Sequence, residues 1–200
     1  MKKILTLLCI LNLHTAFSQT AENIIIITTD GLRWQEVFTG MDSAIANNKK
    51  FNQDDSAVIF KKYWSDDPVE RRKKLLPFLW SSIEKNGQVY GNRNIGNKID
   101  NANPYWFSYP GYNEIFTGYP DTAINSNSYP PNPNTTLLEF LNKQPKYKNK
   151  VAAFGAWDAF DRILNEERGK FPVYSAFDFT GGSNPTVTEK TINSLLKDSY

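Results

Sequence analysis

A run of β-branched residues near the N-terminus constrains the fold of this chain more than any other feature. Residues 23–29 read Asn-Ile-Ile-Ile-Ile-Thr-Thr, with no alternation between polar and apolar side chains. This pattern is typical of a strand that is buried on both faces, as in a parallel sheet covered by helices. Asp30 and Gly31 follow directly and end the run. The run therefore predicts a central strand of an α/β fold.

Helix signals and a second strand signal follow along the chain. Asp67, Pro68 and Glu70 form a strong helix start. Pro77 is expected to kink this helix, because proline has no N–H to donate. Residues 151–154 predict a second buried strand. Helices are predicted over residues 32–38, 67–85, 110–116, 136–143 and 156–164, with a polar loop over 40–56. The alternation of buried strands with helices favours an α/β fold.

Two Thr-x-x-Glu sequences have the pattern of a capping box, in which a threonine and a glutamate satisfy each other's backbone N–H groups. They occupy residues 136–139 and 186–189. The first predicts the start of the helix over 136–143. The second predicts the start of a last helix.

The first 18 residues have the composition of a secretory signal peptide. A positive region at residues 1–3 precedes an apolar stretch at residues 4–13. That stretch is too short for a membrane-spanning helix, which takes roughly 20 residues. Ala16 and Ser18 place small side chains at a cleavage site. We predict cleavage after Ser18; a buried N-terminal helix is the alternative.

Removal of this signal peptide removes every cysteine and histidine, because Cys9 and His14 are the only ones. It also removes Lys2 and Lys3, so that the remaining 21 Lys and Arg balance 21 Asp and Glu. A neutral chain without a basic block has no electrostatic footprint for nucleic acid. No other apolar run reaches the length of a membrane span. We therefore expect a soluble protein that is periplasmic or secreted.

Asp30 is a candidate metal ligand. It lies at the carboxyl end of the predicted central strand, where ligands bind in open α/β sheets. Carboxylate oxygens bind divalent cations well. Aspartate is also a frequent helix N-cap, and for Asp30 taken alone that is the alternative.

Ser108 is a candidate nucleophile. It stands just before Pro110, which opens a predicted helix, and the first N–H groups of a helix favour an anion such as a phosphate or sulfate ester. A serine hydroxyl activated by a metal or a base could attack that ester. An ordinary N-cap serine is the alternative. The neighbouring aromatic residues 105–107, Tyr109 and Tyr112 could stack on a ligand, but they are more often core residues.

Two stretches of the chain together resemble the alkaline phosphatase superfamily, in particular its phosphodiesterase, nucleotide pyrophosphatase and sulfatase-like branches. The run at residues 23–29 with Asp30 and Gly31 resembles the first strand of the family and its metal-binding Asp-Gly. The second stretch matches the family's nucleophile, the proline two residues on, and the Thr-Gly nine and ten residues on: Ser108, Pro110, Thr117 and Gly118. The resemblance covers roughly residues 23–140.

The resemblance implies a three-layer α/β sandwich with a mostly parallel central sheet. It implies a two-metal hydrolase of small-molecule phosphate mono- or diesters, usually with zinc. Asp30 and Ser108 would bind metal, and Ser108 would form a covalent phosphoryl-enzyme. Asn127 corresponds loosely to an asparagine that donates to a phosphoryl oxygen in the phosphodiesterase branch. The alternative for Asn127 is an ordinary turn residue.

Two departures from the family pattern leave other functions open. Sulfatases have an arginine two residues after the proline of the motif; this position is Tyr112 here, which disfavours the alternative of sulfate-ester hydrolysis. The family's remaining metal ligands are Asp and His residues from later in the chain, and the mature chain has no histidine. We therefore expect residues 19–200 to be the N-terminal part of a longer hydrolase domain, incomplete at the C-terminus. A non-catalytic secreted binding module with a degenerate metal site is the alternative from another class.

Overall fold

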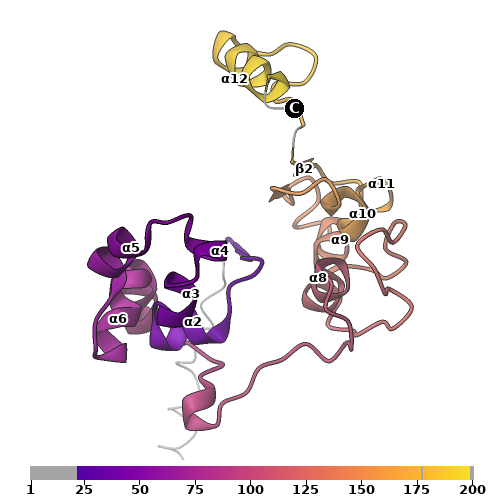
Figure 1. The fold of residues 1–200 in the computed structure, drawn as a ribbon. Coiled ribbons are helices and arrows are strands. Elements are labelled where there is room, and N and C mark those ends of the chain that lie inside the picture. Colours follow the sequence, from indigo (N-terminus) through magenta and orange to yellow (C-terminus); the bar gives the residue numbers. More distant parts are fainter. Residues whose placement is uncertain (1–21, 177, 199–200) are drawn as a thin grey trace, which may run out of the picture. The chain divides into compact units, whose positions relative to one another are not determined.

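The structure of the chain is a computed structural model, and it describes residues 22–176 and 178–198. The predicted signal peptide and its cleavage site at Ser18 lie outside the described residues. The chain divides into two units, residues 1–33 and residues 34–200. Figure 1 labels helices and strands of the second unit along the sequence. No helix within the described ranges is long and apolar enough to cross a membrane.

The described part of the first unit, residues 22–33, contains no strand. The four isoleucines of the β-branched run are between 47% and 84% exposed. The prediction of a strand buried on both faces is therefore wrong for this structure. Such a strand needs hydrogen-bonded neighbours along its edges and helices over its faces, and residues 22–33 provide neither. Asp30 and Gly31 form a turn, in which Gly31 has a φ of +72°.

Short helices follow one another at the start of the second unit: α2 (Trp34–Thr39), α3 (Ser43–Ala46), α4 (Lys49–Asn52), α5 (Ser56–Tyr63) and α6 (Pro68–Leu75). The helix predicted over residues 32–38 is confirmed by α2. The loop predicted over residues 40–56 is wrong, because the side chains of Asp42 and Asn48 cap α3 and α4. Asp67 caps α6 as predicted, by accepting a hydrogen bond from the Val69 N–H at 2.9 Å.

The helix predicted over residues 67–85 is interrupted at Pro77. After α6 ends, the chain continues as a π-helical turn, η2 (Leu79–Ile83), and the short helix α7 (Glu84–Asn86). Proline lacks an N–H and restricts the residue before it, so the regular helical hydrogen bonds stop there. Trp80 of η2 packs edge-on against Phe38 of α2, with ring centroids 5.7 Å apart. This contact packs η2 against α2, which lies about 40 residues earlier in the sequence.

A two-stranded parallel sheet lies among the later helices. The elements are η3 (Arg93–Ile95), α8 (Ser108–Thr117), α9 (Leu137–Lys143), β1 (Ala153–Gly155), α10 (Phe160–Leu164), α11 (Glu166–Gly169) and β2 (Val173–Ser175). In the β1–β2 register, Ala153 pairs with Val173 and Gly155 with Ser175. β1 overlaps the strand predicted at residues 151–154, whereas β2 was not predicted. The described residues are thus mixed helical with a small parallel sheet, which agrees with the α/β class.

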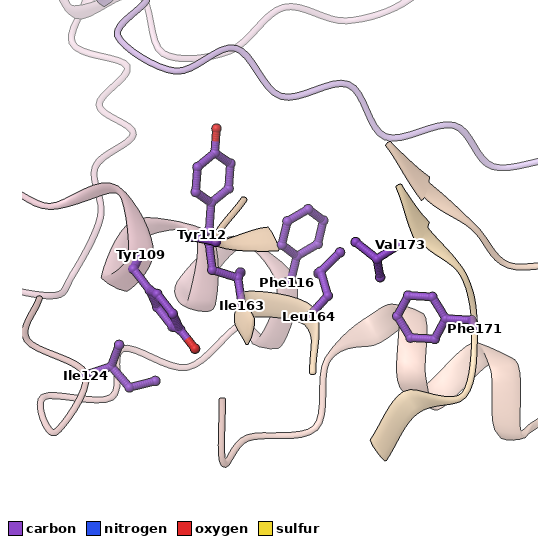
Figure 2. Close-up of a cluster of buried hydrophobic side chains, with 9 residues drawn as sticks. Tyr109, Tyr112, Phe116, Ile124, Ile163, Leu164, Phe171 and Val173 are labelled. Atoms are coloured by element: carbon purple, nitrogen blue, oxygen red, sulfur yellow. The ribbon is translucent and has the colours of Figure 1, made fainter. Parts of the chain in front are cut away.

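An apolar core joins α8, α10 and β2 (Figure 2). Its buried members are Tyr109, Tyr112, Phe116, Ile124, Ala159, Ile163, Leu164, Phe171 and Val173. Tyr112 packs edge-on against Phe160, with ring centroids 4.9 Å apart. The aromatic residues around Ser108 therefore differ in burial: Tyr109 and Tyr112 are core residues, whereas Trp106 is 99% exposed.

The two Thr-x-x-Glu sequences form different structures. At the start of α12 (Val187–Lys197), the box is complete: Thr186 and Glu189 accept hydrogen bonds from each other's backbone N–H groups. At the start of α9, Thr136 is the N-cap as predicted. The carboxylate of Glu139, however, points into the interior and pairs with Arg168. The helix at this site is confirmed, but only half of the box is formed.

Candidate active site at the start of helix α8

Ser108 is the first residue of α8. The N-cap is Phe107, which has an extended backbone with φ −122° and ψ 147°, so the alternative of Ser108 as N-cap is wrong. Ser108 is half-buried, and it places its N–H and hydroxyl at the positive end of a helix of ten residues. This position suits a serine that attacks a bound anion.

Asn127 lies at the same helix start. Its Oδ1 accepts a hydrogen bond from the N–H of Tyr109 at 3.0 Å. Because an N–H can only donate, the amide oxygen must face Tyr109, and the amide NH₂ is left as a donor. This NH₂ group has no hydrogen-bond partner among the residues that the structure describes. The structure therefore brings Ser108 and Asn127 to one place.

The first turn of α8 offers few backbone donors to a ligand. The Tyr109 N–H is bound by Asn127, and Pro110 has no N–H. The Gly111 N–H donates to the carbonyl oxygen of the N-cap residue at 3.4 Å. Within the described ranges, the Ser108 N–H has no partner. An anion at this helix start would thus meet the Ser108 N–H and the Asn127 amide.

The Thr-Gly pair that contributes to the family resemblance ends α8. Gly118 is the C-cap, with φ +68°, a left-handed conformation that glycine adopts without strain. Thr117 Oγ1 donates to the Asn113 carbonyl oxygen at 2.7 Å and accepts from the Tyr119 N–H at 3.1 Å. These residues determine where the helix stops and how the chain enters residues 119–134.

Buried amides attach residues 119–134 to α8 and α10. Asn113 of α8 donates to the Tyr119 carbonyl oxygen at 2.9 Å and accepts from Asn132 Nδ2 at 3.0 Å. Asn132 Nδ2 also donates to the carbonyl oxygen of Ile163 in α10 at 3.0 Å. Both asparagines are fully buried, where an unpaired amide is costly. Their pairing therefore fixes the segment that carries the candidate asparagine.

Arg168 of α11 links the same segment to α9. Its guanidinium donates to the carbonyl oxygens of residues 132–134 at 2.7–3.1 Å. It also donates to both carboxylate oxygens of Glu139 at 2.8–3.1 Å. Burial raises the pKa of the Glu139 carboxyl, but the hydrogen bonds and positive charges of Arg168 and Lys143 outweigh burial, and the pKa is lowered overall.

Glu114 of α8 anchors the chain that leads into Ser108. Its carboxylate accepts hydrogen bonds from the N–H groups of Ala102 at 2.6 Å and Asn103 at 3.0 Å, and from Asn103 Nδ2 at 2.9 Å. Burial raises the pKa of the Glu114 carboxyl, but these donors outweigh burial, so the pKa is lowered overall. The Tyr105 hydroxyl makes a second contact, because it donates a hydrogen bond to the carbonyl oxygen of Thr122 at 2.7 Å.

Asp30 belongs to the first unit, whereas Ser108 and Asn127 belong to the second. Asp30 is exposed and lies in a turn. No group of three or more His, Cys, Asp or Glu side chains that could hold a metal occurs within residues 22–176 and 178–198. Zinc in proteins takes three or four side-chain ligands. Asp30 and Ser108, the two ligands that the resemblance suggests, are fewer than this number.

Several residues that shape this region were not predicted: Tyr109 as an anchor, Asn113, Asn132 and Arg168. A signal for them is present in the sequence. Residues 120–134 contain several prolines, which have no N–H, and several asparagines. A proline-rich segment has fewer N–H groups for its own carbonyl oxygens, so side-chain donors from elsewhere in the chain are expected to satisfy some of them.

No family model, no curated protein and no solved structure matches this chain. The resemblance to the alkaline phosphatase superfamily therefore stays a prediction from two stretches of sequence, residues 23–33 and 108–118.

Proposed function

We propose that this protein hydrolyses phosphate esters outside the cytoplasm, with Ser108 as its nucleophile. The observation that supports the proposal most directly is the hydrogen bond from the Tyr109 N–H to the Asn127 side chain. The resemblance assigns Ser108 and Asn127 to one reaction, and this bond holds the Asn127 amide at the helix that Ser108 begins.

The proposed reaction has two transfers at phosphorus. In the first, Ser108 Oγ attacks the phosphorus atom, the bond to the ester oxygen breaks, and the hydroxyl proton leaves with the alcohol. In the second, water attacks the phosphoserine, the bond to Ser108 breaks, and the serine regains a proton. A monoester substrate thereby releases phosphate, and a diester substrate releases a phosphate monoester. The Ser108 N–H and the Asn127 amide donate to the non-bridging oxygens, where negative charge is concentrated.

The proposal includes zinc, with Asp30 and Ser108 among its ligands, because the resemblance implies it. A metal ion is one means of ionising a serine hydroxyl. Metal binding is tested separately from hydrolysis, because Asp30 and Ser108 make up less than a full zinc site. Calorimetric titration of the natural gene product with zinc is expected to show uptake that Asp30→Asn weakens. No difference between wild type and Asp30→Asn would remove Asp30 from the metal site.

The proposal also extends the small parallel sheet to the central sheet of a three-layer sandwich, in a periplasmic or secreted protein. The intact mass of the natural gene product tests the localisation. We expect an N-terminus at Gln19, after cleavage following Ser18. Retention of residues 1–18 would contradict it.

Ser108→Ala tests the nucleophile. Release of nitrophenol from p-nitrophenyl phosphate and from bis(p-nitrophenyl) phosphate is measured with zinc present, on the natural gene product. We expect Ser108→Ala to lower kcat at least about 10³-fold and to abolish a phosphoserine adduct at this position. Ser81→Ala, an exposed serine in η2, is the matched control and should retain activity.

The other outcomes of this assay separate the alternatives. Full turnover by Ser108→Ala would exclude Ser108 as the nucleophile. Release of sulfate from a nitrophenyl sulfate, without release of phosphate, would favour a sulfate-ester hydrolase despite Tyr112. Absence of turnover and of any adduct in the wild type would favour a non-catalytic binding module.

Asn127→Asp separates a donor role from a turn role. Aspartate keeps an oxygen that can accept from the Tyr109 N–H, but it has no N–H to donate and it adds a negative charge. We expect kcat/KM to fall about 10²-fold with the free energy of unfolding nearly unchanged. Retained activity in Asn127→Asp would show that Asn127 is only a turn residue.

A further inference from the structure

The segment that carries Asn127 touches Tyr109 at three points. The Tyr109 N–H donates to Asn127 Oδ1 at 3.0 Å. The Tyr109 ring packs edge-on against the Tyr129 ring, with centroids 5.9 Å apart. The Tyr109 hydroxyl donates to the Pro130 carbonyl oxygen at 2.8 Å. One residue thus holds both ends of the segment 127–130 (Tyr109 is labelled in Figure 2).

From these contacts we propose that Tyr109 is a positioning residue, which fixes the orientation of the Asn127 amide at the start of α8. The consequence for catalysis rests on the proposed function, in which Asn127 donates to the phosphoryl group. The orientation itself is a property of the fold and is tested without any substrate.

The hydroxyl is the part of Tyr109 that a phenylalanine could not replace. Pro130 and the proline after it have no N–H groups, so the carbonyl oxygens of this segment depend on side-chain donors. Arg162 Nη1 supplies one for the Tyr129 carbonyl oxygen at 2.7 Å. The Tyr109 hydroxyl supplies one for Pro130 and is also within 3.0 Å of the Arg162 carbonyl oxygen.

The surroundings of Tyr109 keep this hydroxyl a donor. The residue is 0% exposed. Burial raises the pKa of the Tyr109 hydroxyl, and the positive charge of Arg162 opposes this only in part. The hydroxyl therefore stays protonated at neutral pH, where it can donate to Pro130. We call the contacts of Tyr109 with residues 127–130 the clamp.

Amide hydrogen exchange tests the clamp directly. The second residue of a helix has no partner for its N–H within the helix, so protection of the Tyr109 amide reports the bond to Asn127. We expect this amide to be protected in the wild type and unprotected in Asn127→Ala. An unprotected Tyr109 amide in the wild type would overturn the proposal even if no variant folded.

Tyr109→Phe then removes the hydroxyl while keeping the ring and the backbone N–H. We expect exchange at residue 109 to become about tenfold faster, which corresponds to a loss of about 1.4 kcal/mol at this bond. Tyr105→Phe is the matched control, because it also removes a tyrosine hydroxyl bound to a carbonyl oxygen, but away from residues 127–130. Equal exchange in the wild type and Tyr109→Phe would overturn the proposal.

A double-mutant cycle connects the clamp with catalysis. We expect Tyr109→Phe to lower kcat about tenfold, and to have no further effect in an Asn127→Ala background, where there is no amide to position. A merely structural role would instead lower activity equally in both backgrounds, and that result would overturn the catalytic part. Absence of ester hydrolysis in the wild type would remove the proposed function and leave the exchange result to decide the clamp.

Discussion

The segments that carry the two main candidate residues, Asp30 and Ser108, differ in what holds them. Residues 22–33 consist of exposed chain, although they include four consecutive isoleucines. Helix α8 is held by buried aromatic rings and by hydrogen bonds that its Asn113 side chain donates and its Glu114 carboxylate accepts. The comparison shows that apolar composition does not by itself bury a segment. A segment is buried where neighbours satisfy its backbone and cover its side chains.

The same substitution in residues 22–33 and in the core that holds α8 gives the largest expected difference. Ile163 of α10 is 0% exposed and Ile25 is 82% exposed. Because truncation of a buried isoleucine removes apolar contacts and leaves a cavity, we expect Ile163→Ala to lower the free energy of unfolding by about 4 kcal/mol. Ile25→Ala should change it by less than about 0.5 kcal/mol. Urea denaturation of the full chain, followed by fluorescence, measures both.

This pair of variants can contradict the difference between residues 22–33 and the core in two ways. A loss of several kcal/mol in Ile25→Ala would mean that residues 23–29 are buried in solution, as the sequence pattern predicted. A negligible loss in Ile163→Ala would mean that the core of α8, α10 and β2 is loosely packed.

The sequence predicted best what depends on neighbouring residues. Helix caps depend only on residues within one turn of the chain, and the predicted caps are present at Asp67, Thr136 and Thr186. The predicted interruption at Pro77 is equally local and is also present. The ion pair of Glu139 with Arg168 could not be predicted, because the two residues are 29 positions apart in the sequence. A local capping pattern competes there with a stronger, distant ion pair.

The β-branched run failed as a structural prediction for the same reason. A strand with this pattern requires hydrogen-bonded neighbouring strands and covering helices. Residues 22–33 form no strand, and their isoleucines are exposed. At the candidate site, Pro110 predicted the helix over residues 110–116, and α8 begins two residues earlier, at Ser108. The resemblance assigned Asn127 a role at the same site, but it did not predict the contact of Asn127 with the Tyr109 N–H, a backbone group that no sequence pattern identifies.

Arg168→Met removes the hydrogen bonds of Arg168 to Glu139 and to residues 132–134. Its expected effect is the second largest. It would leave the buried Glu139 carboxylate with Lys143 alone and three carbonyl oxygens without Arg168. We expect a loss of about 3 kcal/mol, near the lower end for a broken buried pair, because Arg168 is itself partly exposed. Lys143→Met removes the more exposed partner of the same carboxylate and should cost less than about 1 kcal/mol. Thermal and urea unfolding of both variants measure the difference.

Equal losses in Arg168→Met and Lys143→Met would contradict this assignment. They would mean that the positive charge near Glu139 matters and that the hydrogen bonds from Arg168 to residues 132–134 do not. A larger loss in Lys143→Met would place the main support of Glu139 within α9.

The smallest expected effect concerns pH and the hydrogen bonds that Glu114 accepts from the chain leading into Ser108. The pKa of Glu114 is lower in the folded protein than its ordinary value of 4.5. A carboxylate with a lowered folded pKa contributes stability that is fully present above its unfolded pKa and is lost as the pH falls through the folded pKa. Glu139 contributes in the same direction. Stability should therefore fall as the pH is lowered from 6 through 4.5 and below.

Glu114→Gln should cost about 1–2 kcal/mol at pH 7, where its carboxylate accepts three N–H bonds. The substitution should cost less at pH 3, because protonation of the wild-type carboxyl weakens these bonds. Urea midpoints at both pH values measure the two differences, and a cost that is the same at pH 7 and pH 3 would mean that the Glu114 charge does not hold residues 102–103 against α8.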